Sequence, residues 1–236
     1  MNRIYVTASA IIAGGLMLAA LIFGLLFKEA RGARHTVSVT GSATQAFVSD
    51  VVKWRITLSR QVSDGGQSEG YAQLRGDAER LREQLKAAGV ADTAMAMLPP
   101  SAQPMWGPQG VRTGYNLQQP IYVISDSPAL EQLAINPGSF TSPGTAVDQS
   151  VLEYYYSDIA RIKHNLLGAA TRDARARADE IAKSAGSAVG QIMTARSGVF
   201  QITEPYSTEV SGMGMYNTGT RRKEITVTVR ADFVLR

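Results

Sequence analysis

The sequence contains no cysteine among its 236 residues. Without this residue the chain forms no disulfide bond, carries no thiolate nucleophile and offers no sulfur ligand to a metal ion. The absence alone does not fix the redox compartment, although a chain without thiols suits an oxidising environment such as a cell envelope. Disulfide scaffolds, cysteine hydrolases and cysteine-ligated metal centres are therefore excluded as function classes.

Histidine is almost as scarce, because only His35 and His164 occur. Neither residue has an acidic or histidine partner three or four positions further on, so neither fits a helical metal site or an oriented general base. A Gly-x-Ser-x-Gly elbow and a Ser-x-x-Lys pair are likewise missing where a nucleophile would be expected. We therefore predict no catalytic residue, no metal site and no cofactor, and we expect a protein that is not an enzyme.

Two other patterns of chemical interest have ordinary explanations. The carboxylate pairs at 77/79 and 179/180 each have an arginine at helical spacing, which is typical of a solvated ion-pair face and not of a glycosidase. The glycines at 212, 214 and 219 match neither a phosphate-binding loop nor a dinucleotide fingerprint, and no helix follows them. A mobile hairpin loop is the interpretation that this second stretch favours.

Charge of one sign is not concentrated anywhere along the chain. The net charge of +4 comes from scattered Lys and Arg, which gives little support for a polyanionic partner, so we predict no nucleic-acid binding. Of the two tryptophans, Trp54 fits the apolar face of a strand, whereas Trp106 lies in a Pro/Gly-rich stretch and is a candidate exposed contact. The loops around Trp106 and 205–220 thus leave open an alternative function, binding of a peptide, glycan or lipid of unknown identity.

One long uncharged run stands at the N-terminus. Residues 4–27 carry no charge, and 24 helical residues extend about 36 Å, enough to cross a hydrocarbon core of about 30 Å. We predict one N-terminal transmembrane helix, with residues 1–34 as anchor and linker. The charged residues that follow favour an uncleaved anchor over a cleaved signal, and both alternatives stay open. The flanking charges do not favour an exported C-terminus.

The remaining residues, 35–236, predict one α+β domain with mainly antiparallel sheet, strand pairs and two long amphipathic helices. Pro120 cannot donate a ladder hydrogen bond and predicts an edge or an interrupted strand. The helices are expected at 68–90, 127–134 and from about 158 to 185. Strands are expected at 35–43, 50–60, 115–125, 151–158, 187–203 and 224–236, and loops at 99–114, 136–150 and 204–223.

The most charge-dense stretch, "ATRDARARADEIAKSAG" at 169–185, falls within the last helix. On a helical projection Leu166, Ala170, Ala174, Ala178, Ile181 and Ala185 form one apolar arc, which predicts a small-residue face close to the sheet. Asp173, Arg177 and Glu180 lie at the edge of this arc, with spacing that lets the arginine bridge two carboxylates. The net charge of the stretch is four minus three, or +1, so we predict a structural or interfacial ion set and no nucleic-acid surface.

Several longer stretches together resemble the SIMPL-domain family, which is largely bacterial and envelope-associated. They are "VSVTGSATQAFVSDVVKW", "EYYYSDIARIKHNLLGAATRDARARADEIAKSAGSAVGQI", "GVFQIT" and "TVTVRADFVL". The chain is most similar to a subgroup with Ser-Asp, here Ser49 and Asp50, where other members have Pro-Asp. The resemblance implies an α+β fold, export and assembly into homo-oligomers, and loosely a role in envelope or oxidative stress tolerance. It supplies no agreed catalytic residue.

Together these observations predict a non-enzymatic, membrane-anchored SIMPL-domain protein that self-assembles. Its expected location is the inner (cytoplasmic) membrane, with a single span and the C-terminal domain in the periplasm or outside. This expectation follows from the uncleaved-looking N-terminal segment, which departs from family members with cleavable signals. Whether the ion set of Asp173, Arg177 and Glu180 closes within one subunit or between two is the question that the sequence leaves open.

Overall fold

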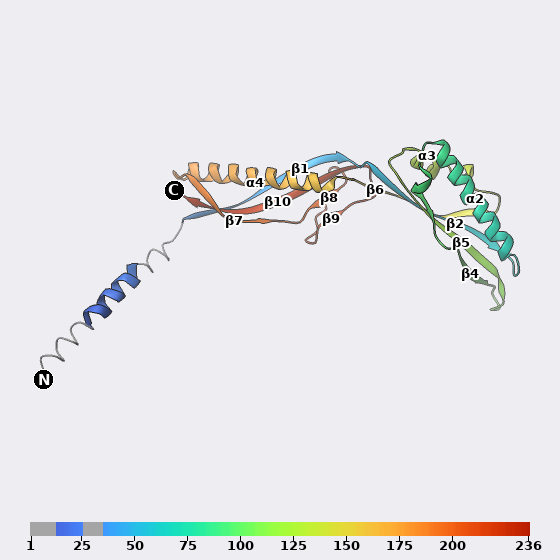
Figure 1. Ribbon diagram of the computed structural model, residues 1–236, viewed down its shortest axis with the longest axis horizontal. Helices are drawn as coiled ribbons and strands as arrows, with labels where there is room; N and C mark the ends of the chain where they lie inside the picture. Colours follow the sequence, from blue (N-terminus) through green and yellow to red (C-terminus); the bar gives the residue numbers. More distant parts are fainter. Residues whose placement is uncertain (1–12, 26–34) are drawn as a thin grey trace, which may run out of the picture. The chain divides into compact units, whose positions relative to one another are not determined.

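A computed structural model describes residues 13–25 and 35–236 of the chain (Figure 1). Apart from the N-terminal residues, the chain divides into two compact units. Unit 1 contains the described residues up to Gly41 together with 172–196 and 230–236, and unit 2 contains 42–171 and 197–229. Three strands and one helix contribute residues to both units.

The predicted transmembrane helix is wrong for the described part of the chain. Within the described residues, the uncharged run is helical at 13–25. Of the helices in 13–25 and 35–236, none is both long and apolar enough to span a membrane. The rest of the uncharged run, 4–12 and 26–27, lies outside the described residues.

The mainly antiparallel strands and the two long helices are as predicted. In unit 2, the strand order of one sheet is β3-β5-β2-β6, and β4 also pairs with β5. The central strand β2 pairs antiparallel with β5 along one edge and with β6 along the other. The bounds of these strands are β2 Val51–Val62, β3 Met95–Met97, β4 Ser101–Trp106, β5 Arg112–Ser125 and β6 Thr145–Tyr155.

Two strands occupy the stretch that was expected to be loop at 99–114. The β4 strand and the start of β5 form a hairpin, in which Ser101 lies opposite Gln118 and Pro104 opposite Tyr115. The high proline and glycine content concealed these strands, because the pairing partner β5 stabilises them and their own propensity does not. Strand β6 likewise begins within the loop expected at 136–150.

Pro120 lies in the middle of β5, and β5 is not an edge strand. The Pro120 carbonyl accepts a hydrogen bond from the Leu98 N–H at 3.0 Å. The Pro120 nitrogen, which carries no hydrogen, faces the same way and therefore also lies opposite the segment between β3 and β4. That segment, residues 98–100, is the break between the two strands. The side-chain amide of Gln119 donates to the Leu98 carbonyl at 2.6 Å. This bond replaces the one that the proline nitrogen cannot donate.

One helix covers this sheet because its apolar positions follow a single face. Helix α2, Gln67–Ala87, buries Leu74, Ala78, Leu81 and Leu85 against the alternate residues of β2, which are Val52, Trp54, Ile56 and Leu58. Figure 1 shows α2 running along one side of β2 and β5. Gly89, with φ of +81°, follows the end of the helix in the left-handed conformation that glycine favours there.

A short helix and two 3-10 turns complete unit 2 on this sheet. Helix α3, Ala129–Ile135, contacts β2 and β6, and Phe140 packs edge-to-face on Trp54 with ring centroids 6.1 Å apart. The turns are η1, Asp92–Ala94, and η2, Pro137–Ser139. These segments bury the large aromatic centre of the core.

The second sheet has the strand order β1-β10-β8-β9, and β7 also pairs with β10. Strand β10 has the predicted alternation, since Ile225, Val227, Val229, Ala231 and Phe233 are all buried. The stretch expected to be a strand pair or one bent strand becomes β7 and β8, which both pair with β10. The bounds are β1 Thr36–Val48, β7 Val189–Ser197, β8 Gln201–Thr203, β9 Met215–Tyr216 and β10 Arg222–Leu235.

Helix α4, Ile159–Ser184, is the charge-rich helix of the sequence. Its buried residues are spaced four apart throughout, at Ile162, Leu166, Ala170, Ala174, Ala178 and Ala182. The predicted apolar face is therefore wrong at its C-terminal end, where Ala182 is buried and Ile181 is 51% exposed. A strict four-residue spacing advances about 40° per step around the helix, so the buried stripe winds around the helix instead of following one straight face.

Candidate functional site

The most exposed backbone feature of unit 1 is the edge of β1. Among the described strands β1 has one neighbour, β10, which leaves the donors and acceptors of its other edge without a strand partner. The 13 residues of β1 include no charged residue and no proline. Soluble proteins usually protect such an edge with lysine, proline or a bulge, because an unprotected edge pairs with other chains.

A groove lies between this edge and helix α4. It is lined by Ser38, Val39 and Thr40 of β1 and by Arg177, Glu180 and Ile181 of α4, with a volume of about 460 Å³. Two residues of the predicted ion set, Arg177 and Glu180, therefore lie beside the strand edge. Ile181 adds an exposed apolar side chain to the same groove.

The predicted ion set is only partly joined. The Arg177 Nε donates to the Asp173 carboxylate at 2.8 Å, and the two side chains are 54% and 34% exposed. Of the ion pairs that form among residues 13–25 and 35–236, none includes Glu180, which is exposed. An exposed pair of this kind contributes less than about 1 kcal/mol to the stability of one subunit.

Arg175 has a larger structural role than its neighbours on α4. It pairs with Asp179 at 3.3 Å, as the helical spacing predicts. It also donates to the backbone carbonyls of Gly190 at 2.7 Å and Val189 at 3.0 Å. The guanidinium carbon lies 5.5 Å from the ring centroid of Phe233. This arginine therefore ties α4 to strands β7 and β10 within unit 1.

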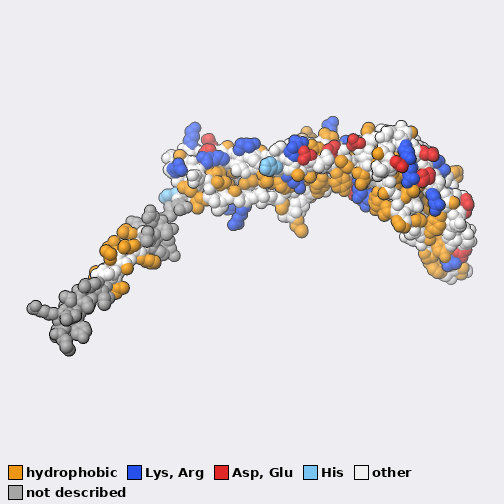
Figure 2. All heavy atoms as spheres, in the orientation of Figure 1, with side chains coloured by type: hydrophobic (Ala, Val, Ile, Leu, Met, Phe, Trp, Pro, Cys, Tyr) orange, Lys and Arg blue, Asp and Glu red, His pale blue; other side chains and the backbone are white. Residues whose placement is uncertain are grey.

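The charges on α4 are mixed in sign. Figure 2 shows Lys and Arg side chains together with Asp and Glu side chains along the helix, and Arg175 and Arg177 are each paired with an aspartate. A nucleic-acid surface would keep its cations available for phosphate. The mixed charges thus favour the prediction that this helix does not bind nucleic acid.

Hydroxyl groups line the solvent side of β1 where it meets β10. The Thr194 and Ser38 hydroxyls donate to Asp232, and these hydrogen bonds hold the pKa of that carboxyl below its usual value. In unit 2 the Thr44 and Thr226 hydroxyls are 2.8 Å apart. This face of β1 therefore offers small polar groups and no ionised side chain of its own.

Trp106 is 63% exposed, but it ends strand β4 instead of lying in a loop. The Gly-Pro turn that follows connects it to β5, where Val111 is also exposed. The other predicted contact region, the loop at 205–220, presents Tyr206, Val210 and Met213 almost fully to solvent. Both regions thus display large apolar side chains.

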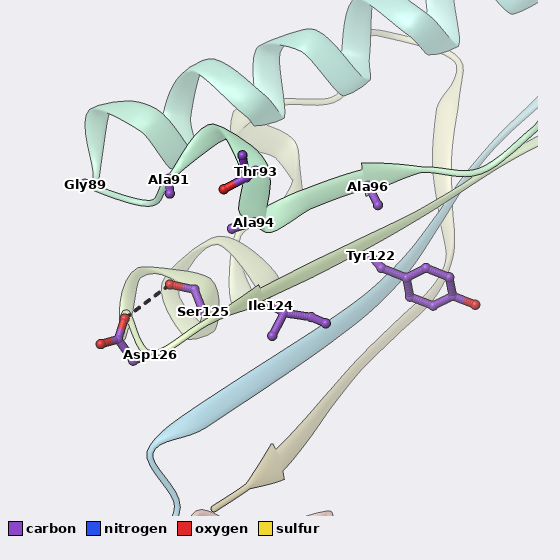
Figure 3. Close-up of a pocket in the computed structure, with 9 residues that line it drawn as sticks. All are labelled: Gly89, Ala91, Thr93, Ala94, Ala96, Tyr122, Ile124, Ser125 and Asp126. Carbon is purple, nitrogen blue, oxygen red and sulfur yellow. Dashed lines mark hydrogen bonds between the residues drawn. The ribbon is translucent and has the colours of Figure 1, made fainter. Parts of the chain in front are cut away.

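A pocket of about 540 Å³ in unit 2 lies next to β3 and β5 (Figure 3). Its lining is mostly small residues, with Tyr122 and Ile124 projecting from β5. One carboxylate, Asp126, is present and lies 3.5 Å from the Ser125 hydroxyl. Because the lining brings no second charged side chain toward Asp126, the pocket lacks the convergent polar groups that orient a substrate.

A lysine that the sequence analysis overlooked is fully buried in unit 2. Lys223 is 0% exposed, its ammonium donates to the Thr220 carbonyl, and the Nζ lies 6.0 Å from the ring centroid of Tyr154. Burial lowers the pKa of Lys223 to about 8, against the opposing attraction of Glu204. The sequence did contain a sign of this burial. Position 223 is an even number of residues from the buried positions 225, 227 and 229, so its side chain points to the same face of the strand.

The Ser49-Asp50 pair of the family resemblance has a structural role. Burial alone would raise the pKa of the Asp50 carboxyl, but hydrogen bonds from the Ser157 hydroxyl and N–H lower it. These bonds, of 2.5 and 2.8 Å, hold the turn before α4. The Ser49 N–H donates to the Arg221 carbonyl at 2.8 Å, a bond that a proline at this position could not make.

Asp77 contradicts the expectation of a solvated ion-pair face. It is completely buried and accepts hydrogen bonds from the Ser142 N–H and hydroxyl, the Thr145 hydroxyl and Arg80. Glu79 matches the expectation, because it pairs with Arg82 at 3.0 Å on the surface. The chain around Ser142 folds back over α2, and no local pattern in the sequence predicts that contact.

The described residues define a class of protein, an α+β protein with two mainly antiparallel sheets, in which only β8 and β9 are shown to pair in parallel, and an uncharged free strand edge. Among them, no three His, Asp or Glu side chains gather in a way that would hold a metal ion. The family model named SIMPL, described as a protein of unknown function (DUF541), matches residues 37–233. The chain therefore belongs to the SIMPL family, as its resemblance indicated, and no curated protein matches it.

Proposed function

We propose that this SIMPL-domain protein is non-enzymatic and self-assembles through the free edge of β1. The observation that carries the proposal is a strand of 13 residues without charge or proline at the end of a sheet. Added strands gain a complete row of backbone hydrogen bonds from such an edge. A second copy of the chain is the partner present at the highest effective concentration in any homogeneous preparation.

The groove beside the edge supports assembly in unit 1. A partner strand laid along Ser38 to Thr40 would cover the exposed Ile181 and bring its own groups next to Arg177 and Glu180. The Glu180 carboxylate could accept a cation from the partner. Arg177 binds Asp173 through its Nε, so its terminal nitrogens could bind a carboxylate of the partner. Shared between two subunits, this ion set would fix the register of the contact more than it would stabilise it.

Size-exclusion chromatography with light scattering tests the proposal on the chain without residues 1–34. The expected result is a mass well above one chain for the unaltered protein and a shift to a single chain for Thr40→Lys, which places a charge at the free edge. Thr228→Lys, exposed on the central strand β10, is the matched control and should keep the assembled mass. A strictly monomeric unaltered protein at about 1 mM would remove the support for self-assembly.

We also propose that the assembled domain functions outside the cytoplasm, in the cell envelope, where a role in stress tolerance would belong. The absence of cysteine and membership of the SIMPL family support this location. A reporter fused after Arg236 that is active only outside the cytoplasm should be active. Cytoplasmic activity of a reporter that requires reduction would contradict the proposal.

Binding of a ligand is a second candidate function, and the exposed loop at 205–220 favours it. Tyr206 and Met213 are 93% and 96% exposed, and soluble proteins rarely leave such large apolar groups uncovered without a use. Thermal-shift screening against peptides, glycans and lipids of the envelope should then find a stabilising compound. A screen in which the midpoint never moves would weaken this candidate and leave the assembly proposal unaffected.

A further inference from the structure

A strained turn precedes the exposed loop of unit 2. The Ser207 N–H donates to the Glu204 carbonyl at 3.3 Å, with Pro205 and Tyr206 between them. Tyr206 has φ of +63° and is the one non-glycine residue among those described with positive φ. Turns with proline in second place and positive φ in third place normally have glycine there, because a bulky side chain destabilises that conformation.

Burial does not compensate for this strain. The Tyr206 side chain is 93% exposed, so it gains little from packing, and glycine at this position would relax the turn. Bulky residues kept in unfavourable backbone conformations cluster at functional positions, where the side chain is needed at one place. The place in this case is the mouth of a pocket.

The pocket has apolar walls and a volume of about 440 Å³, which is in the range of small-molecule sites. Val48 of β1 and Pro205 with Tyr206 supply exposed apolar groups to its lining, and the ring of Phe47, which also borders the pocket, is packed on Tyr156 in the core. Phe47 is buried, whereas Val48 is 55% exposed. An apolar group that enters would contact Val48 on one side and the ring of Tyr206 on the other.

Two opposite charges share the floor of this pocket. Arg222 and Glu224 both line it, and because they are two residues apart on β10 they point to the same face, about 6.7 Å apart along the strand. Among the ion pairs formed by the described residues, none includes either side chain. Lys223 also lines the pocket, but its side chain is fully buried and its ammonium is bonded to the Thr220 carbonyl.

From this arrangement we infer that the pocket binds a free α-amino acid with a large apolar side chain. The carboxylate of the ligand would pair with Arg222 and its ammonium with Glu224, through charge-assisted hydrogen bonds of about 2.8 Å each. The ligand backbone would thus bridge two side chains of opposite charge that stand two residues apart on one strand. The ligand side chain would lie between Val48 and the ring of Tyr206.

The pairing of charges argues against ligands that carry only one. A simple carboxylate such as a fatty acid would leave Glu224 without a counterion, and an amine would leave Arg222 without one. The inference gives a chemical class to the ligand-binding candidate, and it is independent of assembly at β1 because the groove in unit 1 shares no residue with this pocket.

Isothermal titration of the full chain with L-phenylalanine tests the inference, with 3-phenylpropionate and phenethylamine as ligands that each lack one charge. The expected result is saturable binding of phenylalanine that is at least tenfold tighter than that of either comparison ligand. Arg222→Met and Glu224→Gln should each weaken phenylalanine binding at least tenfold. Arg230→Met, an exposed arginine on the same strand, is the matched control and should bind as the unaltered chain does.

Tyr206→Gly separates a binding role from a structural one. This variant should raise the melting temperature, because it relieves the strained turn, and should lower affinity for phenylalanine at least tenfold. Absence of binding by phenylalanine, tyrosine and leucine, with the unaltered chain folded by circular dichroism, would overturn the inference. So would equal affinity for phenylalanine and 3-phenylpropionate. Light scattering on the same samples reports assembly separately, so failure of one proposal is distinguishable from failure of the other.

Discussion

Helices α2 and α4 both cover an antiparallel sheet, but they do so with different side chains. The buried face of α2 carries three leucines, Leu74, Leu81 and Leu85, opposite a core that includes Trp54 and Phe140. In unit 1 the buried residues of α4 are Ala174, Ala178 and Ala182, opposite a cluster that includes Val39, Ala231 and Phe233. The contact of α2 with its sheet buries large side chains, whereas the contact of α4 in unit 1 brings the helix backbone close to the sheet.

The difference has energetic consequences. Burial of a leucine side chain contributes about 1.5–3 kcal/mol, and a single alanine methyl group contributes far less. The α4 contact in unit 1 therefore depends more on polar ties such as those of Arg175 to the β7 carbonyls. A region with a thin core gains proportionally more from a partner that covers its exposed strand edge, which is consistent with the proposed assembly at β1.

The largest expected effect is on the leucine-rich side of the comparison, at the buried carboxylate of α2. Asp77→Ala leaves the Ser142 and Thr145 hydroxyls and the Ser142 N–H without their acceptor, so we expect a loss of about 4 kcal/mol in the free energy of unfolding. Urea denaturation measures this change. Glu79→Ala, which removes a surface pair two residues away, should cost less than about 0.5 kcal/mol. Similar losses for the two variants would contradict the role assigned to Asp77.

The alanine face of α4 should resist larger side chains. Ala178→Leu inserts three carbon atoms into a contact that is 0% exposed, and we expect a loss of about 2 kcal/mol from overpacking. Ala176→Leu is the matched control on the same helix, because Ala176 is exposed. Thermal denaturation of both variants checks the expectation, and an unchanged Ala178→Leu protein would show that α4 does not lie close to the sheet.

A smaller effect, with opposite sign, is expected at Lys223. Its folded pKa of about 8 lies below the unfolded value near 10.5, so the unfolded chain binds more protons between these two values. Stability from this group is lowest below pH 8 and rises as the pH increases from 8 to about 10. Lys223→Met removes a burial cost on the order of 3 kcal/mol, partly offset by the lost bond to Thr220 and the lost attraction to Glu204.

The net gain expected for Lys223→Met at pH 7 is about 1 kcal/mol. Urea denaturation at pH 7, 8, 9 and 10 should show a stability that rises with pH for the unaltered chain and a flatter profile for the variant. Tyr154 and Tyr155, whose pKa values are raised mainly by burial, oppose the rise only above pH 10. A parallel pair of profiles would show that the Lys223 pKa is unchanged on folding.

The smallest effect should come from the surface pair of α4. Asp173→Ala removes an ion pair in which the arginine is 54% exposed, and we expect a change below about 0.5 kcal/mol in the stability of one subunit. Chemical denaturation at low protein concentration checks this value. A loss above about 2 kcal/mol would show that the pair is structural within one subunit, and the comparison between the two helices would need revision.

Alternation and helical periodicity predicted the strands and helices that bury one face and expose the other. Strand β2 and strand β10 match the strands expected at 50–60 and 224–236 to within two residues at either end and bury alternate residues, and α2 lies within three residues of the bounds expected for it. The family membership also followed from the sequence, because the matching stretches cover most of the chain. In these cases burial on one side of an element leaves a regular pattern in the residues themselves.

Contacts between distant segments explain what the sequence did not predict. Strand β4 exists because β5 pairs with it, and Asp77 is buried because the chain near Ser142 folds back over α2. Ala182 replaces Ile181 on the buried face because the contact of α4 follows a winding stripe. The pocket at Tyr206 joins β1, β10 and the turn before the loop, so no single stretch of sequence indicates it.

Pro120 has one more consequence, for errors during folding. A slip of β5 by one residue would turn its buried residues outward and would be rejected by the core, but a slip by two residues keeps every side chain on its face. Only backbone chemistry can tell these two alignments apart. Because Pro120 fits where β3 and β4 are interrupted, a two-residue slip would set a carbonyl opposite a nitrogen that has no hydrogen, and the sheet would lose a bond. Pro120 thus disfavours a two-residue slip of β5, an error that alternating hydrophobicity alone does not disfavour.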